Sequence, residues 1–265
     1  MWVDCDPAMG LPFADVDDAL ALVFLVASGV RVAGISTCYG NAALDRLHPV
    51  AERLAAELGI PVVVRGAARP GDTDTAAAEA LASFRGTVLA IAPLTNVAAA
   101  LARGARWERL VVLGGSARRM RNVRPLHTTE LNFALDEPAA EVVLRERCDL
   151  VPMEPCRSAW FGAAELAALP PSMERACRTW RWTSPLRTAS FSFHPWDLVA
   201  AAWLTDPDLV SARPARAILA SGPLSRGYIR YVEGPGHVLD AVDGPALCER
   251  FAARVRGWRD RPPPK

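Results

Sequence analysis

The sequence predicts a single α/β domain with a mainly parallel central sheet and helices on its faces. Short apolar segments alternate with longer segments of helical period through the first two-thirds of the chain. Strands that alternate with helices of this length form parallel sheets through right-handed crossovers. No linker rich in glycine, serine or proline divides the 265 residues. Residues 1–258 are therefore predicted to form one domain, and the proline-rich segment 259–265 a flexible tail.

The expected elements follow one another along the chain, and the last third is less regular. Strands are predicted at 2–3, 31–37, 61–64, 87–92, 109–113 and 150–153, with weaker β signals at 216–220 and 228–231. Helices are predicted at 17–28, 45–58, from 95 and at 138–147. Ligands of such sheets bind beyond the carboxyl ends of the strands. Those ends correspond to residues 4–6, 37–41, 93–96 and 114–132.

Composition argues against several classes of partner. The 30 basic residues balance 29 acidic ones, which is not typical of a general nucleic-acid-binding protein. No segment approaches the roughly 18 apolar residues of a membrane span, and the start lacks the pattern of a signal peptide. Six cysteines without metal-type spacing indicate reduced thiols. We expect a cytoplasmic protein that binds neither nucleic acid nor membrane.

Five aspartates lie close together after the first predicted strand: Asp4, Asp6, Asp15, Asp17 and Asp18. Their mutual repulsion is costly unless cations or hydrogen-bond donors offset it. Hard cations such as Ca²⁺ and Mg²⁺ prefer oxygen ligands, which these side chains supply. Asp17 alone is equally explained as a helix cap. For the group of five, a metal site is the better interpretation.

An Asp-x-Asp motif at the end of a first strand also occurs in phosphatases of the haloacid dehalogenase type. There the first aspartate attacks phosphorus and a downstream lysine steadies the charge. The only lysine of this chain is Lys265, at its end, and the motif Asp4–Pro7 lacks the residues usual after the first aspartate. A metal-dependent phosphatase is therefore a distant alternative.

Seven motifs in order resemble those of the nucleoside hydrolase family. The opening motif is split into two halves, and the others follow over nearly the whole chain. They are Asp4–Pro7 with Asp17–Ala21, Gly40–Asn41, Ala92–Asn96, Leu113–Ser116 with Glu130–Asn132, Asp136–Ala140, Trp196–Asp197 and Gly222–Gly227. The resemblance implies hydrolysis of the N-glycosidic bond of ribonucleosides to ribose and free base, in a homodimer or homotetramer.

The resemblance also implies a calcium site and a general base. Asp6, Asp18, Asp197 and the backbone carbonyl of Thr95 would hold Ca²⁺, which also takes the 2′- and 3′-hydroxyls of ribose. Asp6 would activate a metal-bound water, because a bound cation makes that water easier to deprotonate. The water would attack C1′ through a transition state with oxocarbenium character.

Further residues would hold the sugar on the same grounds. Asp17, Asn41 and Asn132 would bind ribose hydroxyls, and Asn122 with Glu130 the 5′-hydroxyl. Simpler structural explanations exist for several of them. Asn96 and Asn132 are equally consistent with turn or cap residues, Thr95 with a helix cap, and Glu130 with a surface charge.

The chain departs from the family at four places. Residues Ala8–Ala14 are inserted in the opening motif, so Phe13 and Asp15 are expected on a loop near the mouth of the site. The stretch from 66 to 87, which in relatives often lines the base pocket, is short. The turn that begins at Glu154 differs from the family's Leu-Asp-Val-Thr-like turn. Trp196 replaces the histidine that in many relatives protonates the leaving base.

Trp196 tilts the predicted substrate towards purine nucleosides. A purine-preferring branch of the family has Trp-Asp at this point and stacks the aromatic ring on the base. Packing of Trp196 in the core is an equally good explanation. His194 is a candidate replacement acid, and His127 a weaker one. A non-catalytic ribose- or nucleoside-binding protein on the same scaffold remains the alternative function.

Overall fold

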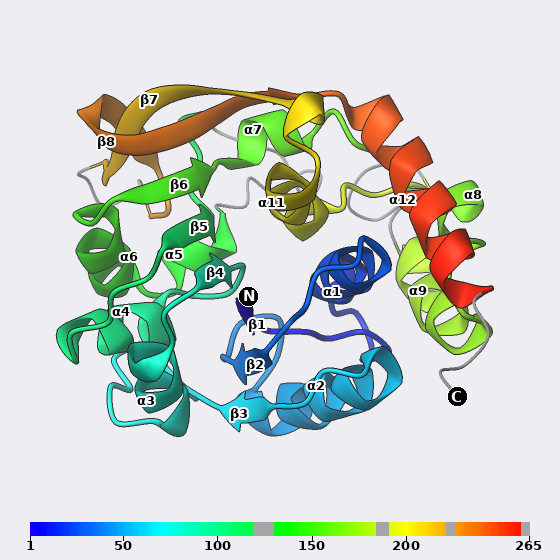
Figure 1. Ribbon diagram of the computed structural model, residues 1–265, viewed down its shortest axis with the longest axis horizontal. Coiled ribbons are helices and arrows are strands. Elements are labelled where there is room, and N and C mark those ends of the chain that lie inside the picture. Colours follow the sequence, from blue (N-terminus) through cyan, green and yellow to red (C-terminus); the bar gives the residue numbers. More distant parts are fainter. Residues whose placement is uncertain (119–129, 184–190, 221–225, 261–265) are drawn as a thin grey trace.

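Eight strands form one sheet in the order β3-β2-β1-β4-β5-β6-β8-β7 (Figure 1). The computed structural model describes residues 1–118, 130–183, 191–220 and 226–260. All neighbouring strands are parallel except β7 and β8. The predicted α/β class with a mainly parallel sheet is confirmed. The strands are β1 Trp2–Cys5, β2 Gly34–Thr37, β3 Val63–Arg65, β4 Thr87–Ala90, β5 Arg109–Leu113, β6 Cys148–Val151, β7 Val210–Leu219 and β8 Ile229–Val242.

Helices cover both faces of the sheet (Figure 1). On one face α3 (Ala76–Ser83), α4 (Thr95–Ala102) and α6 (Glu137–Leu144) enclose the smaller core cluster. The opposite face carries the larger cluster, under α1, α2, α9, α11 and α12. These helices are α1 Asp17–Ala27, α2 Leu44–Leu58, α9 Pro171–Thr183, α11 Trp196–Thr205 and α12 Gly244–Arg259; the short helices are α5 Leu131–Ala134, α7 Met153–Cys156, α8 Ala163–Leu166 and the 3₁₀ turn Pro207–Leu209.

Helix α1 is buried on nearly every side. All of its residues except Val26 are buried, because it lies between the sheet and the outer helices (Figure 1). A helix that is apolar all round is expected in such a position. It packs against α11, and this contact brings two distant parts of the chain together at their helix N-termini.

Most predicted elements are found with ends that differ by one to three residues, and two differences have a clear physical cause. The strand predicted at 150–153 ends at Val151, and Met153 begins α7, because Pro152 cannot donate a ladder hydrogen bond. The weak β signals of the last third belong to a long antiparallel hairpin of β7 and β8. Its register shifts between Ser211 and Ala212 and between Pro214 and Arg216, which obscures the alternating pattern in the sequence.

The chain ends and helix lengths bear on two other expectations. Helix α12 continues to Arg259, one residue into the predicted tail, and 261–265 lie outside the described residues. Within the described part, every helix is too short or too polar to cross a membrane.

Candidate active site

Three aspartate side chains converge beyond the carboxyl end of β1. Asp17 and Asp18 open α1, and Asp197 lies in the first turn of α11. One carboxylate oxygen from each lies within 4.8 Å of the others, and all three side chains are buried. Because α1 and α11 pack together, the partial positive charges of both helix N-termini are directed at this point. The fold thus joins the opening motif to the late motif.

Asp6 lies beside this group, although a seven-residue insertion separates it from Asp17. Its backbone N–H donates to Asp18 Oδ1 at 2.9 Å. The backbone N–H of Asn41 donates to Asp6 Oδ2 at 2.5 Å, and Asn41 Nδ2 donates to Asp18 Oδ2 at 3.1 Å. A Cβ on Gly40 would lie 2.1 Å from Asp6 Oδ2, so only glycine allows this close approach. The insertion therefore leaves Asp6, Asp18 and Asn41 together.

The charges of this group repel one another. Burial, followed by the neighbouring carboxylates, raises the pKa values of Asp6, Asp17 and Asp197 well above their usual range. Burial likewise raises the pKa of Asp18 to about 7. No arginine, lysine or histidine of the described residues forms an ion pair with these four carboxylates. Buried carboxylates without a counter-charge are costly, and a divalent cation that prefers oxygen ligands fits this arrangement.

A further acidic residue, directly after the insertion, joins the group. The side chain of Asp15 hydrogen-bonds to that of Asp17, and its charge contributes to the raised pKa of Asp17 after burial. The sequence placed Asp15 on a loop near the mouth but gave no indication of this contact. Spacing alone does not reveal it, because the contact depends on the path of the inserted loop.

Two backbone carbonyls compete for the role of metal ligand. Thr95 is the first residue of α4, after Leu94 at the N-cap, so its carbonyl faces along the helix towards the N–H four residues on. Its hydroxyl donates to Asp136 Oδ2 at 2.6 Å. Ile91, directly after β4, receives no described hydrogen bond at its carbonyl, because its expected parallel-ladder donor, the N–H of Asp6, is bonded to Asp18. The Ile91 carbonyl is therefore the better placed of the two.

Asp4, the first aspartate of the opening motif, is held apart from the cluster. It is fully buried, and its Oδ1 accepts hydrogen bonds from Ser36 Oγ at 2.5 Å and Asn96 Nδ2 at 2.9 Å. Burial raises its pKa to about 7. Asn96 also accepts from the Ala67 backbone N–H. Asp4 and Asn96 thus connect the strands beneath the site.

Glu130 and Asn132 lie beyond the carboxyl end of β5. Glu130 is 5% exposed, so the surface-charge interpretation is wrong. Its carboxylate accepts from the backbone N–H groups of Asn132 and Phe133 and caps α5. Burial raises its pKa to about 7, against the effect of these donors and of Gly115 N–H. Asn132 Nδ2 donates to Leu113 O at 3.1 Å, and no side chain or backbone group of the described residues donates to its side-chain oxygen, which could therefore bind a ligand.

Glu154 begins the turn in which the chain departs from the family. Its side chain contacts the residues that follow β5. It lies in the first turn of α7, beyond the carboxyl end of β6. Its Oε1 accepts from Ser116 Oγ and from the Arg118 backbone N–H, both at 2.9 Å. Glu154 therefore fixes the chain as it leaves β5 towards residues 119–129. The predicted site residue Asn122 and the weaker acid candidate His127 lie outside the described residues.

Three aromatic rings, two of them in the segment that leads to Asp197, pack against one another at tilted angles. The His194 ring lies 3.8 Å from the Trp160 ring and 4.9 Å from the Trp196 ring, between centroids. His194 Nδ1 lies 2.9 Å from the Ala159 carbonyl, so this nitrogen carries the proton. Burial and then the charge of Arg157 lower the pKa of His194, while the Ala159 carbonyl opposes this. A neutral His194 is suited to form part of an aromatic wall and poorly suited to donate a proton.

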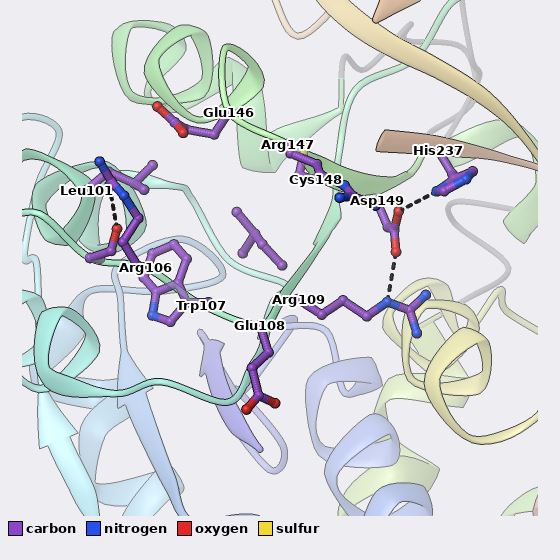
Figure 2. Close-up of a pocket in the computed structure, with 12 residues that line it drawn as sticks. Leu101, Arg106, Trp107, Glu108, Arg109, Glu146, Arg147, Cys148, Asp149 and His237 are labelled. Atoms are coloured by element: carbon purple, nitrogen blue, oxygen red, sulfur yellow. Dashed lines mark hydrogen bonds and ion pairs between the residues drawn. The ribbon is translucent and has the colours of Figure 1, made fainter. Parts of the chain in front are cut away.

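A pocket lies on the other side of the sheet from the aspartate group, at the amino ends of the strands. Figure 2 shows this pocket of about 430 Å³, which the amino ends of β5 and β6 line together with His237 of β8. Three of its polar side chains pair: Arg109 Nε donates to Asp149 Oδ2 at 2.7 Å, and His237 Nδ1 lies 3.0 Å from Asp149 Oδ1. It contains none of the aspartates described above and lies at the wrong edge for a ligand site of this fold.

Comparison with known proteins identifies the family of this chain. The profile of the inosine-uridine preferring nucleoside hydrolase family matches residues 1–249. A non-specific ribonucleoside hydrolase of Klebsiella pneumoniae is 34% identical over 184 residues, which is 64% of this chain and 60% of that relative. The chain therefore matches less than two-thirds of the length of this curated relative.

Solved structures share the fold at low sequence identity. A plant nucleoside hydrolase superimposes with a TM-score of 0.82 at 19% identity, covering 96% of this chain and 98% of the other. A purine-preferring ribonucleoside hydrolase from Gardnerella vaginalis superimposes with a TM-score of 0.79 at 19% identity, covering 97% and 98%. With the family profile matching almost the entire chain, this protein belongs to the inosine-uridine preferring nucleoside hydrolase family.

Proposed function

We propose that this protein hydrolyses the N-glycosidic bond of ribonucleosides, favouring purine nucleosides, to ribose and free base. The observation that carries the proposal is the group of four buried carboxylates, without a basic partner in the described residues, beyond the carboxyl end of β1. Family membership supports the reaction. The activity named for the Klebsiella relative is of the same class.

The donor set suits calcium. Asp6, Asp18 and Asp197 would supply carboxylate oxygens, and Ile91 or Thr95 a backbone carbonyl. Bound there, the ion would supply positive charge that offsets the carboxylates and orients the ribose hydroxyls. Asp17 and the free carbonyl oxygens of Asn41 and Asn132 would accept hydrogen bonds from the sugar.

Asp6 is proposed as the general base. It would take a proton from the attacking water, which adds to C1′ as the bond from C1′ to the base breaks. The Asn41 N–H that donates to Asp6 Oδ2 at 2.5 Å fixes the orientation of this carboxylate. Groups that bind ribose more tightly as C1′ gains positive charge lower the barrier.

The departing base would stack on Trp196 and take its proton from solvent water rather than from a histidine. His194, with its lowered pKa and its Nδ1 against the Ala159 carbonyl, supports a neutral aromatic wall. This is the basis for favouring purines, whose larger faces stack more strongly. The purine preference named for the Gardnerella neighbour is compatible with it.

Release of free ribose from inosine, guanosine, adenosine, uridine and cytidine, measured with calcium present, tests the proposal. We expect turnover of the purine nucleosides and weaker turnover of the others. Activity confined to uridine and cytidine would contradict the purine preference. Thermal stabilisation by ribose or nucleosides without any ribose release would instead indicate a binding protein.

A further inference from the structure

The inserted loop Ala8–Ala14 is firmly anchored. Ala8 and Ala14 are buried against Leu47 of α2 in a small apolar cluster. Met9 is 2% exposed and belongs to the large core, and its carbonyl accepts from Arg53 Nη2 at 2.9 Å. A buried and hydrogen-bonded loop has a defined shape rather than a range of conformations.

Phe13 is the exception within this loop, in two respects. Its φ of 59° makes it the one non-glycine residue with positive φ among the described residues. Its side chain is 71% exposed, more than any other large apolar side chain in the same part of the chain. A left-handed backbone is strained for a bulky residue, and an exposed aromatic ring forgoes burial. Strain of this kind is concentrated at ligand-binding sites.

Phe13 lies close in sequence to the aspartate group, four residues before Asp17. Two residues later, Asp15 hydrogen-bonds to the Asp17 side chain. On the other side, Ala42, the neighbour of Asn41, packs against the apolar cluster that anchors the loop. The loop is therefore anchored next to chain segments that carry residues of the proposed site.

Each of the two chain segments that lead into the aspartate group carries an aromatic residue close in sequence to its aspartate. Asp197 and Asp17 converge; Trp196 precedes the first, and Phe13 lies four residues before the second. A nucleobase is a flat ring system whose faces are apolar, and aromatic rings bind such faces by stacking. Phe13 has the exposure and the fixed position that this contact requires.

We propose that Phe13 is a specificity-determining residue whose ring packs against the leaving nucleobase. The inference rests on the proposed function and assigns a role to a loop that the opening motif of the family lacks. The phenyl ring has no group that can donate or accept a proton. Phe13 would therefore contribute to substrate binding and take no part in proton transfer. Its loss should therefore weaken substrate binding without slowing the bound complex.

Substitutions at this single position separate binding from folding. Phe13→Ala should raise KM for purine nucleosides about tenfold, with kcat within about twofold, since one stacked base contributes roughly this much. Phe13→Gly should raise KM equally while raising the melting temperature, because glycine adopts positive φ without strain. Phe13→Trp keeps an aromatic ring at this position and should leave KM near the wild-type value. Val142→Ala, which trims a 41% exposed side chain on α6, is the matched control and should change neither quantity.

The outcomes distinguish the two proposals. If the wild-type protein releases ribose and both Phe13→Ala and Phe13→Gly keep its KM, the role of Phe13 is overturned while hydrolysis stands. If the wild-type protein releases no ribose, hydrolysis itself fails. Calorimetric titration with adenine then decides: weaker binding by Phe13→Ala supports the stacking role, and equal binding overturns it.

Discussion

Asp206 and the aspartate group of the candidate site are both buried, but they differ in whether basic side chains of the described residues pair with them. Asp206 and Asp18 are each 1% exposed. Asp206 accepts hydrogen bonds from Arg250 at 2.7 Å and from Arg254 at 2.6 and 2.7 Å. Although burial acts to raise it, the pKa of Asp206 is lowered by these partners and by Thr205. The pKa of Asp18 is raised to about 7, with burial as the main cause.

The difference lies in where the counter-charge comes from. Asp206 receives its positive charge from the chain itself, and the resulting network joins the end of α11 to α12 and, through Arg254, to Ser28. The aspartates at the N-termini of α1 and α11 receive none from the described residues. A folded protein tolerates such a group when a ligand completes it. The comparison thus separates a structural carboxylate from a set whose charge a bound cation could balance.

The largest effect should follow loss of the proposed base. Asp6→Asn keeps the shape of the side chain and removes its ability to take a proton, so kcat should fall by about a thousandfold. Calcium binding, measured by calorimetry, should weaken but persist because Asp18 and Asp197 remain. An Asp6→Asn protein with wild-type turnover would show that another residue is the base.

The next largest effect should be at Asp206. Asp206→Ala leaves two arginines without their buried partner, and we expect a loss of about 3 kcal/mol in the free energy of unfolding in urea. Asp208→Ala removes the exposed partner of Arg250 and should cost under about 1 kcal/mol. Equal losses for the two variants would contradict the structural role given to Asp206.

The two sets should also respond oppositely to pH. The pKa of Asp18 is raised from 3.8 to about 7, so its protonated form is favoured by folding, and stability should fall as pH rises from about 4 to about 7. We expect a loss of about 4 kcal/mol over this range in chelator-treated protein, and little loss with saturating calcium. Asp206, with a lowered pKa, should lose its contribution only as pH falls below about 4. Urea unfolding at each pH, with and without calcium, measures both.

The smallest effect is a gain. Asp18→Asn removes one charge from the repelling group and should stabilise the metal-free protein by about 1 kcal/mol. The same variant should lose most of the stabilisation that calcium gives to the wild type. Thermal unfolding with chelator and with calcium measures both; destabilisation of the metal-free protein would mean that the Asn41 and Asp6 hydrogen bonds to Asp18 outweigh the repulsion.

The sequence predicted the regular part of the fold well and the hairpin poorly. β5 is found at its predicted residues, and α1 begins at Asp17 as expected, because apolar periodicity is strong there. In the hairpin, Pro214 and the run from Gly234 to Gly236 interrupt the alternation. Long antiparallel pairing with register shifts leaves no simple pattern of period two.

Within the site, residue types were predictable and contacts were not. The opening motif indicated a group of carboxylates, but the approach of Asp197 followed only from the resemblance. Glu130 was expected to bind sugar, and its capping of α5 depends on a helix of four residues that no periodicity reveals. The free carbonyl of Ile91 arises from a ladder hydrogen bond that Asp18 replaces. Such features depend on three-dimensional pairing.

The packing of α1 against α11 gives the proposed ion a mechanical consequence. An ion shared by Asp18 and Asp197 would tie the end of the first strand to a helix in the last third, closing most of the chain into a loop. Cross-links that close long loops reduce the entropy of the unfolded chain, much as a disulfide does. The six cysteines of this protein are all buried and unpaired. Bound calcium would therefore act as a reversible cross-link, which is lost when the ion dissociates.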